Sequence, residues 1–200
     1  MTVVCALAGA AVFGAIGGCA FDTPAAISNI RYDLGPQIPP AYSGPLPALR
    51  LFDVHAPAAL DTDDILYRMS YADPRRTASY ANSHWTMRPA QLLTVRVRGA
   101  LAARGAVLSG GQAVNAPLLT IDLDQFEQVF DSESESQGTL TARATLTRDG
   151  ALIAQQTFVA RAPASTANAA GGVQALAAAS DQFVAQLMAW LGMQAGAVAQ

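Results

Sequence analysis

Residues 139–147 alternate strictly between two kinds of side chain, and this pattern limits the possible folds more than any other part of the chain. Threonine or arginine separates the small and apolar residues Leu140, Ala142, Ala144 and Leu146. Successive side chains of a β-strand point to opposite faces, so this spacing predicts a strand with one buried face. The turn sequence Arg148-Asp149-Gly150 follows, and residues 152–161 are expected to return beside the strand as a hairpin.

More strands are predicted upstream of this hairpin. Leu119, Ile121 and Leu123 alternate with polar residues, which indicates a third member of an antiparallel meander with one buried face. Shorter strands are expected at residues 30–34, around residues 49–54 and at residues 65–69, between segments rich in Pro and Gly.

Two helices are predicted to cover the sheet. Pro89 suits the first position of a helix over residues 89–104, which Gly105 ends and whose arginines, Arg96, Arg98 and Arg104, are expected at the solvent edge. A second helix is predicted over residues 169–191. One of its faces carries residues at three-and-four spacing: Val173, Leu176, Ser180, Phe183, Leu187 and Trp190 or Leu191.

The order of these elements predicts an α+β fold, in which two main helices pack on one face of a mostly antiparallel sheet. A chain of 200 residues suits one hydrophobic core, so a single domain is expected. All 12 basic residues are arginines scattered among 15 acidic residues, and this excludes the clustered charge of a nucleic-acid-binding protein.

The N-terminus has the layout of a bacterial lipoprotein signal. Residues 1–18 carry no charged side chain and lead into Ile16-Gly17-Gly18-Cys19, an aliphatic residue and two small residues before a cysteine. We expect cleavage before Cys19, lipidation of its thiol, and a tether over residues 19–29. The domain is then predicted over residues 30–192, followed by a tail over residues 193–200.

The lipid anchor places the predicted domain on a membrane surface without a spanning helix. Cleavage leaves Cys19 as the single cysteine, so no intramolecular disulfide is expected. The residue after Cys19 is Ala20. In enteric bacteria an aspartate at this position keeps a lipoprotein in the inner membrane, so the alanine favours the outer membrane. We therefore expect a periplasm-facing envelope protein.

The chain offers few groups for catalysis, and no catalytic residue or cofactor is predicted. His55 and His84 are the only histidines, there is no lysine, and no Gly-x-Ser-x-Gly motif is present. His55 is expected at the rim of a strand and His84 in a loop. A hydrolase would need one of them to meet a serine and an acid in one cleft.

Neither of the two acidic segments of the chain is predicted to bind a metal ion. Asp61-Thr62-Asp63-Asp64 lacks the glycine and the distal glutamate of a calcium-binding loop, so it is interpreted as a solvated turn. The acidic run at residues 131–136 is expected to be a hairpin tip or a partner contact. Neither glycine pair, at residues 110–111 or 171–172, matches a nucleotide-binding motif.

Several short motifs, in a consistent order, resemble the ABC-type transport auxiliary lipoprotein family, which includes the paraquat-inducible protein C type. After the signal that ends at Cys19 come a Tyr-x-Leu-Gly motif at residues 32–35 and an aliphatic-Asp-Thr-x-x-Ile-x-Tyr-Arg motif at residues 60–68. A Tyr-x-x-Ser-x-Trp motif follows at residues 80–85, then the opening of a helix at residues 88–93 and a Phe-containing strand at residues 123–130.

The resemblance implies a non-enzymatic accessory subunit that works with an ABC permease, its ATPase and an MCE-domain protein. Lipid passing between envelope membranes is the implied cargo, and a homo-oligomer lining a conduit is one implied arrangement. The family supplies no catalytic residues. A different class of function, a standalone lipoprotein that holds a lipid or small apolar ligand between sheet and helices, would instead show a closed apolar pocket in the monomer.

The motif-rich stretch supplies the candidates for partner contact, because aromatic residues and arginine dominate interface hot spots. These candidates are Asp61, Thr62, Tyr67, Arg68, Tyr80 and Trp85. Trp85 precedes a predicted helix, where a core position is also compatible with its size.

Overall fold

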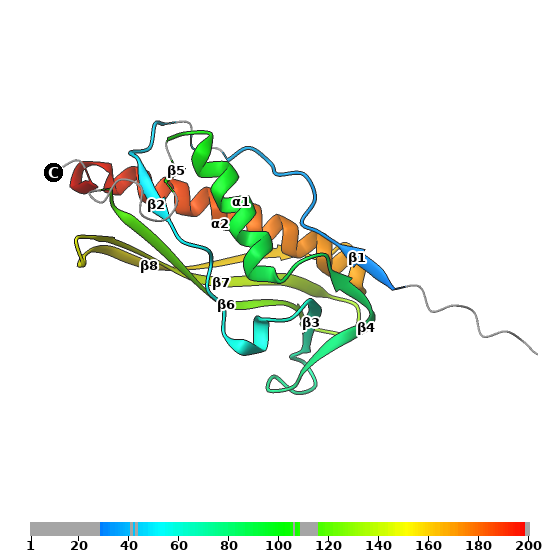
Figure 1. Cartoon of the computed structure of the whole chain (residues 1–200). Helices are drawn as coiled ribbons and strands as arrows, with labels where there is room; N and C mark the ends of the chain where they lie inside the picture. Colours follow the sequence, from blue (N-terminus) through cyan, green and yellow to red (C-terminus); the bar gives the residue numbers. More distant parts are fainter. Residues whose placement is uncertain (1–28, 41, 43, 106, 109–115, 199–200) are drawn as a thin grey trace, which may run out of the picture.

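A computed structural model describes residues 29–40, 42, 44–105, 107–108 and 116–198. The predicted signal peptide, Cys19, nearly all of the tether and the first glycine pair lie outside these residues. The described chain has the predicted α+β fold: one mixed, mostly antiparallel sheet of eight strands and two helices on one of its faces (Figure 1).

Three long strands form one side of the sheet, with β8 at its edge, and confirm the predicted meander. They are β6 (Leu118–Phe130), β7 (Ser136–Arg148) and β8 (Ala151–Pro163), each antiparallel to the next. Asp149 and Gly150 form the turn between β7 and β8 with positive φ angles of 50° and 81°. The acidic run falls in the turn between β6 and β7, as one of its two interpretations predicted.

Five shorter strands complete the sheet: β1 (Ile30–Tyr32), β2 (Leu49–Leu51), β3 (Asp64–Met69), β4 (Thr77–Trp85) and β5 (Val107–Leu108). The strand order is β1-β4-β3-β6-β2-β5, with β7 and β8 beyond β6. Strand β6 pairs with β2 near its start and with β3 near its end, both in parallel. The sheet therefore forks along this edge of β6, and the short 3-10 helix η1 (Ala58–Leu60) lies in the connection between the two branches.

Strand β4 was missed in the sequence, and the placement of His84 in a loop was wrong. Most of the strand is small or polar, and only Ser83 and Trp85 are buried. Alternation of apolar residues therefore does not mark it. It forms because it pairs antiparallel with β3 and parallel with β1.

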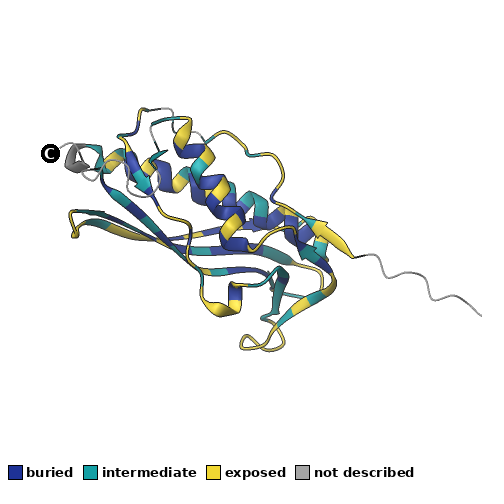
Figure 2. Ribbon diagram, in the orientation of Figure 1, coloured by how far each residue is buried: buried dark blue, intermediate teal, exposed yellow. Residues whose placement is uncertain are grey.

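Helix α1 (Pro89–Ala102) begins at the predicted proline, and helix α2 (Ala169–Val198) runs beyond the predicted end at residue 191. The predicted apolar face of α2 packs on β7 and β8, where the Phe158 ring lies 5.7 Å from that of Phe183 and 5.9 Å from that of Trp190. Figure 2 shows the buried residues concentrated between helices and sheet. Among the described residues, no helix is both long enough and apolar enough to span a membrane.

The prediction that Arg96 lies at the solvent edge was wrong. Its side chain is 4% exposed and forms an ion pair with Asp181 of α2. It also donates hydrogen bonds to the carbonyl oxygens of Leu34 and Gly35, the latter at 3.0 Å. Because these partners come from α2 and from the segment after β1, the sequence around Arg96 gives no sign of them.

The close contact between α2 and β7 depends on a glycine. A Cβ at Gly138 would come within 2.5 Å of the Ala175 carbonyl carbon and the Leu176 nitrogen. We expect Gly138→Ala to lower the free energy of unfolding by about 1–3 kcal/mol, because the helix must move away from the sheet.

Gly99→Ala is the matched control for Gly138→Ala. A Cβ at Gly99 meets only the flexible end of the Gln37 side chain, at 3.2 Å, and alanine is the better helix former by about 1 kcal/mol. Denaturant unfolding compares the two variants with the parent protein. Equal losses of stability at both positions would contradict the close contact between helix and strand.

Candidate functional site

A groove of about 520 Å³ lies where the sheet forks. We call it the motif groove, because motif residues of β3 form one wall. Strand β6 carries a bulge between Leu123 and Gln125 at this point, and β3 pairs with β6 only from Gln128 onward. The residues lining the motif groove include Leu60, Leu66, Arg68, Thr77, Gln125, Phe126 and Glu127.

An ion pair forms the polar wall of the motif groove. Arg68 donates from Nε to Glu127 Oε1 at 2.9 Å and from Nη2 to Glu127 Oε2 at 3.1 Å, which is the two-pronged geometry of a strong arginine–carboxylate pair. The Glu127 side chain is 4% exposed and that of Arg68 is 26% exposed. The pair is therefore largely shielded from water.

Further hydrogen bonds hold this ion pair in place. Gln125 Nε2 donates to Glu127 Oε1 at 2.7 Å, and Thr141 Oγ1 donates to Gln125 Oε1 at 3.2 Å. Arg68 Nη1 donates to the carbonyl oxygen of Pro74 at 2.8 Å, in the turn between β3 and β4. The network thus links β7, β6, β3 and the β3–β4 turn, and it fixes the shape of the motif groove.

Tyr67 and Tyr80 lie together on the neighbouring strands β3 and β4. Their ring centroids are 4.8 Å apart, and the Tyr67 ring also contacts that of Phe130 edge to face. The Tyr80 hydroxyl donates to Oε1 of the fully buried Gln128 at 2.8 Å. Burial, and next the proximity of Tyr67, raise the pKa of Tyr80 to about 12, so its phenol stays neutral at ordinary pH.

The remaining contact candidates divide between surface and core. Asp61 is exposed and forms an ion pair with Arg88 at 3.0 Å, while Thr62 Oγ1 donates to Asp64 Oδ2 at 3.0 Å at the start of β3. Trp85 is 1% exposed and packs against Phe126, so it has almost no surface to offer a partner.

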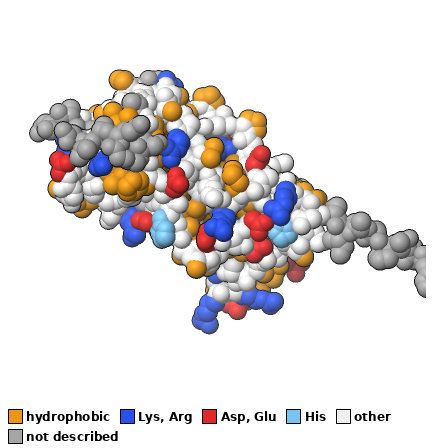
Figure 3. Space-filling view, in the orientation of Figure 1, with side chains coloured by type: hydrophobic (Ala, Val, Ile, Leu, Met, Phe, Trp, Pro, Cys, Tyr) orange, Lys and Arg blue, Asp and Glu red, His pale blue; other side chains and the backbone are white. Residues whose placement is uncertain are grey.

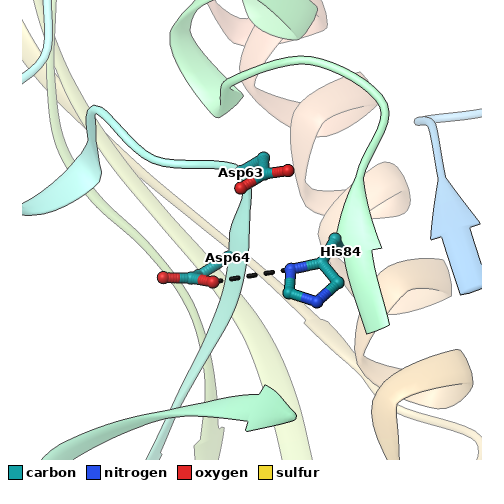
Figure 4. A group of neighbouring side chains, drawn as sticks. All are labelled: Asp63, Asp64 and His84. Atoms are coloured by element: carbon teal, nitrogen blue, oxygen red, sulfur yellow. Dashed lines mark ion pairs between the residues drawn. The ribbon is translucent and has the colours of Figure 1, made fainter. Parts of the chain in front are cut away.

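The structure brings together a cluster that the sequence separates. Asp64 at the start of β3 and Asp63 just before it lie beside His84 on β4 (Figure 4), with one potential ligand atom from each residue within 4.8 Å of the others. Arg31 of β1 donates to Asp63 Oδ2 at 2.8 Å, and this hydrogen bond holds the pKa of Asp63 below its usual value. The segment interpreted as a solvated turn therefore has defined partners.

Two parts of these sites could not be recognised in the sequence. Glu127 and Gln125 lie in the segment that resembles the Phe-containing strand of the family. The only sign of their role in the sequence is that an acid and an amide occur within a largely apolar strand. His84 joins the aspartates only through the pairing of β3 with β4. Figure 3 shows the two histidines at separate places on the surface, and the backbone of His55 forms an isolated parallel β-bridge opposite Asp122 of β6.

Comparison with known proteins gives one family and several related folds. The model of a family described as the ABC-type transport auxiliary lipoprotein component matches residues 32–188. A crystal structure of a Xanthomonas campestris protein, assigned to the family model DUF330, has a TM-score of 0.72 at 22% identity and covers 82% of this chain and 97% of its own. A crystal structure of an uncharacterized protein has a TM-score of 0.64 at 17% identity, with coverages of 82% and 99%. At these identities the likeness concerns the fold alone, and no curated protein matches the chain.

Proposed function

This chain belongs to the ABC-type transport auxiliary lipoprotein family, as its motifs predicted, and from that premise we propose that it serves an MCE-type ABC system that moves lipids between envelope membranes. Its role there is that of a lipid-anchored, periplasm-facing subunit. It acts through protein contacts with the MCE-domain protein or the permease and performs no chemistry of its own.

The motif groove is the observation that carries this proposal. It combines an apolar floor, formed by Leu60, Leu66 and Phe126, with an arginine held rigidly at its wall. Interfaces are strongest where a partner side chain fills such a pocket beside arginine or aromatic groups. Because Arg68 is already paired with Glu127, the motif groove suits an apolar side chain of the partner better than a charged one.

The chemistry of the site supports a binding role rather than catalysis. Among the described residues, those that line the motif groove include no histidine, cysteine, serine or lysine, and the carboxylate of Glu127 is already paired with Arg68. Tyr80 does not line the motif groove, and its pKa of about 12 makes it a poor general base or acid near neutral pH. Asp61 and Thr62 lie just before β3, Tyr67 lies on β3 and Tyr80 on β4, and we assign these four residues to shaping or extending the contact surface.

Affinity purification of the full chain, tagged at its C-terminus and extracted from membranes in mild detergent, tests the function. We expect co-purification of an MCE-domain protein or of ABC subunits, together with an N-terminal peptide that begins at acylated Cys19. Co-purification of lipid with no transporter subunit would favour the standalone lipid-binding lipoprotein. An unmodified Cys19 with no transporter subunit would contradict both the anchor and the proposed role.

A further inference from the structure

The cluster of Asp63, Asp64 and His84 has the composition of a metal site. Asp64 and His84 lie directly opposite each other in the register of β3 and β4, and Asp63 is the residue just before β3. Two carboxylates and one imidazole are ligands for borderline divalent ions such as Zn²⁺, Mn²⁺ and Fe²⁺. Strand pairing holds Asp64 and His84, and the Asp63 carbonyl oxygen accepts a hydrogen bond from the Trp85 N–H at 2.7 Å, so the fold positions all three residues.

The distance between Asp64 and His84 fits ligands of one ion better than a hydrogen bond. His84 Nδ1 lies 3.5 Å from Asp64 Oδ1, beyond the usual range of about 2.7–3.2 Å for a hydrogen bond between nitrogen and oxygen. Zinc binds nitrogen and oxygen at about 2.0–2.2 Å, so two ligands in a tetrahedral site lie about 3.4 Å apart. The observed separation therefore leaves room for an ion between these atoms.

The surroundings of His84 Nδ1 point to the same conclusion. This atom is shielded from solvent and has no hydrogen-bond partner within the described structure. Buried nitrogen and oxygen atoms normally have a partner, so an unsatisfied one calls for an explanation. A metal ion would use the lone pair of this nitrogen.

The other carboxylate oxygens already have hydrogen-bond donors. Thr62 Oγ1 donates to Asp64 Oδ2 at 3.0 Å and leaves Oδ1 facing His84. Arg31 Nη1 donates to Asp63 Oδ2 at 2.8 Å and to the Trp85 carbonyl oxygen at 3.0 Å. Groups that orient ligating side chains in this way are a regular feature of metal sites.

We propose that Asp63, Asp64 and His84 bind a divalent transition-metal ion of the zinc class. The bound ion links β3 to β4, and through Arg31 it fixes β1, the first described strand after the predicted tether. Arg31 offsets part of the negative charge of the two carboxylates. The site therefore favours a metal ion that also binds imidazole, and calcium and magnesium are disfavoured. The site is separate from the motif groove, and the proposal does not depend on the transport role.

Calorimetric titration of the mature, detergent-extracted protein with Zn²⁺ tests the site, and thermal unfolding with and without Zn²⁺ gives a second measurement. We expect one ion per chain and a higher unfolding temperature with Zn²⁺. His84→Ala should abolish both effects. Thr62→Val, which keeps all three ligands but removes a donor to Asp64, should weaken binding by about 10-fold or more.

His55→Ala is the matched control, because His55 is the only other histidine, lies opposite Asp122 of β6 and is not part of the cluster. It should bind Zn²⁺ as the parent protein does. Absence of binding in the parent protein would overturn the proposal and leave His84 and Asp64 as an ion pair. Loss of binding in His55→Ala, or full binding in both His84→Ala and Thr62→Val, would also overturn it.

Discussion

Replacing Arg96 with leucine is expected to lower the free energy of unfolding by about 3–5 kcal/mol, because it removes one partner of a buried ion pair. Asp181, whose side chain is 15% exposed, would remain charged without its arginine. The carbonyl oxygens of Leu34 and Gly35 would also lose a charged donor. Denaturant unfolding of the purified variant measures the loss.

Arg98→Leu makes the same chemical change two residues further along α1. Arg98 pairs with Asp53, whose side chain is 84% exposed, and such surface pairs contribute about 0–1 kcal/mol. A small effect is therefore expected at residue 98. If Arg98→Leu cost as much stability as Arg96→Leu, the buried ion pair would not be the reason for the effect at residue 96.

The second large effect is expected in the motif groove. Arg68→Met should lower the free energy of unfolding by about 3 kcal/mol, because Glu127 is left buried with its charge uncompensated. Adding Glu127→Leu should restore most of that stability, since no buried charge then remains.

A double-mutant cycle over Arg68 and Glu127 measures this coupling. Additive effects of the two substitutions would show that the ion pair does not stabilise the fold as described. The double variant is also useful for function, because it is expected to fold while it lacks the polar wall of the motif groove. It should therefore capture the transport partner less well than the parent protein.

Features encoded by local periodicity could be predicted from the sequence. The meander follows from the alternation at residues 119–123 and 139–147, and the buried face of α2 follows from its three-and-four spacing. In each case one stretch of chain contains both the buried and the exposed positions. The family motifs likewise lie within short segments.

Features that depend on contacts between distant segments could not be predicted. Strand β4 has little apolar alternation and exists because β1 and β3 flank it. Arg96 looks like an ordinary surface arginine until α2 brings Asp181 beside it. Arg68 and Glu127 are 59 residues apart, so their pairing, and the motif groove that it borders, appear only in the folded chain.

Site-specific photocrosslinking in intact cells tests the central claim most directly. A photoreactive residue at Ala59 or Thr77, both exposed and lining the motif groove, is compared with one at Gln182, which is exposed on α2. The proposed role predicts that Ala59 or Thr77 crosslinks to an MCE-domain protein or an ABC subunit, and that Gln182 gives few such crosslinks. The crosslinks from Ala59 or Thr77 should be reduced in the double variant Arg68→Met with Glu127→Leu. Equal crosslinking from all three positions, or none to any transporter subunit, would contradict it.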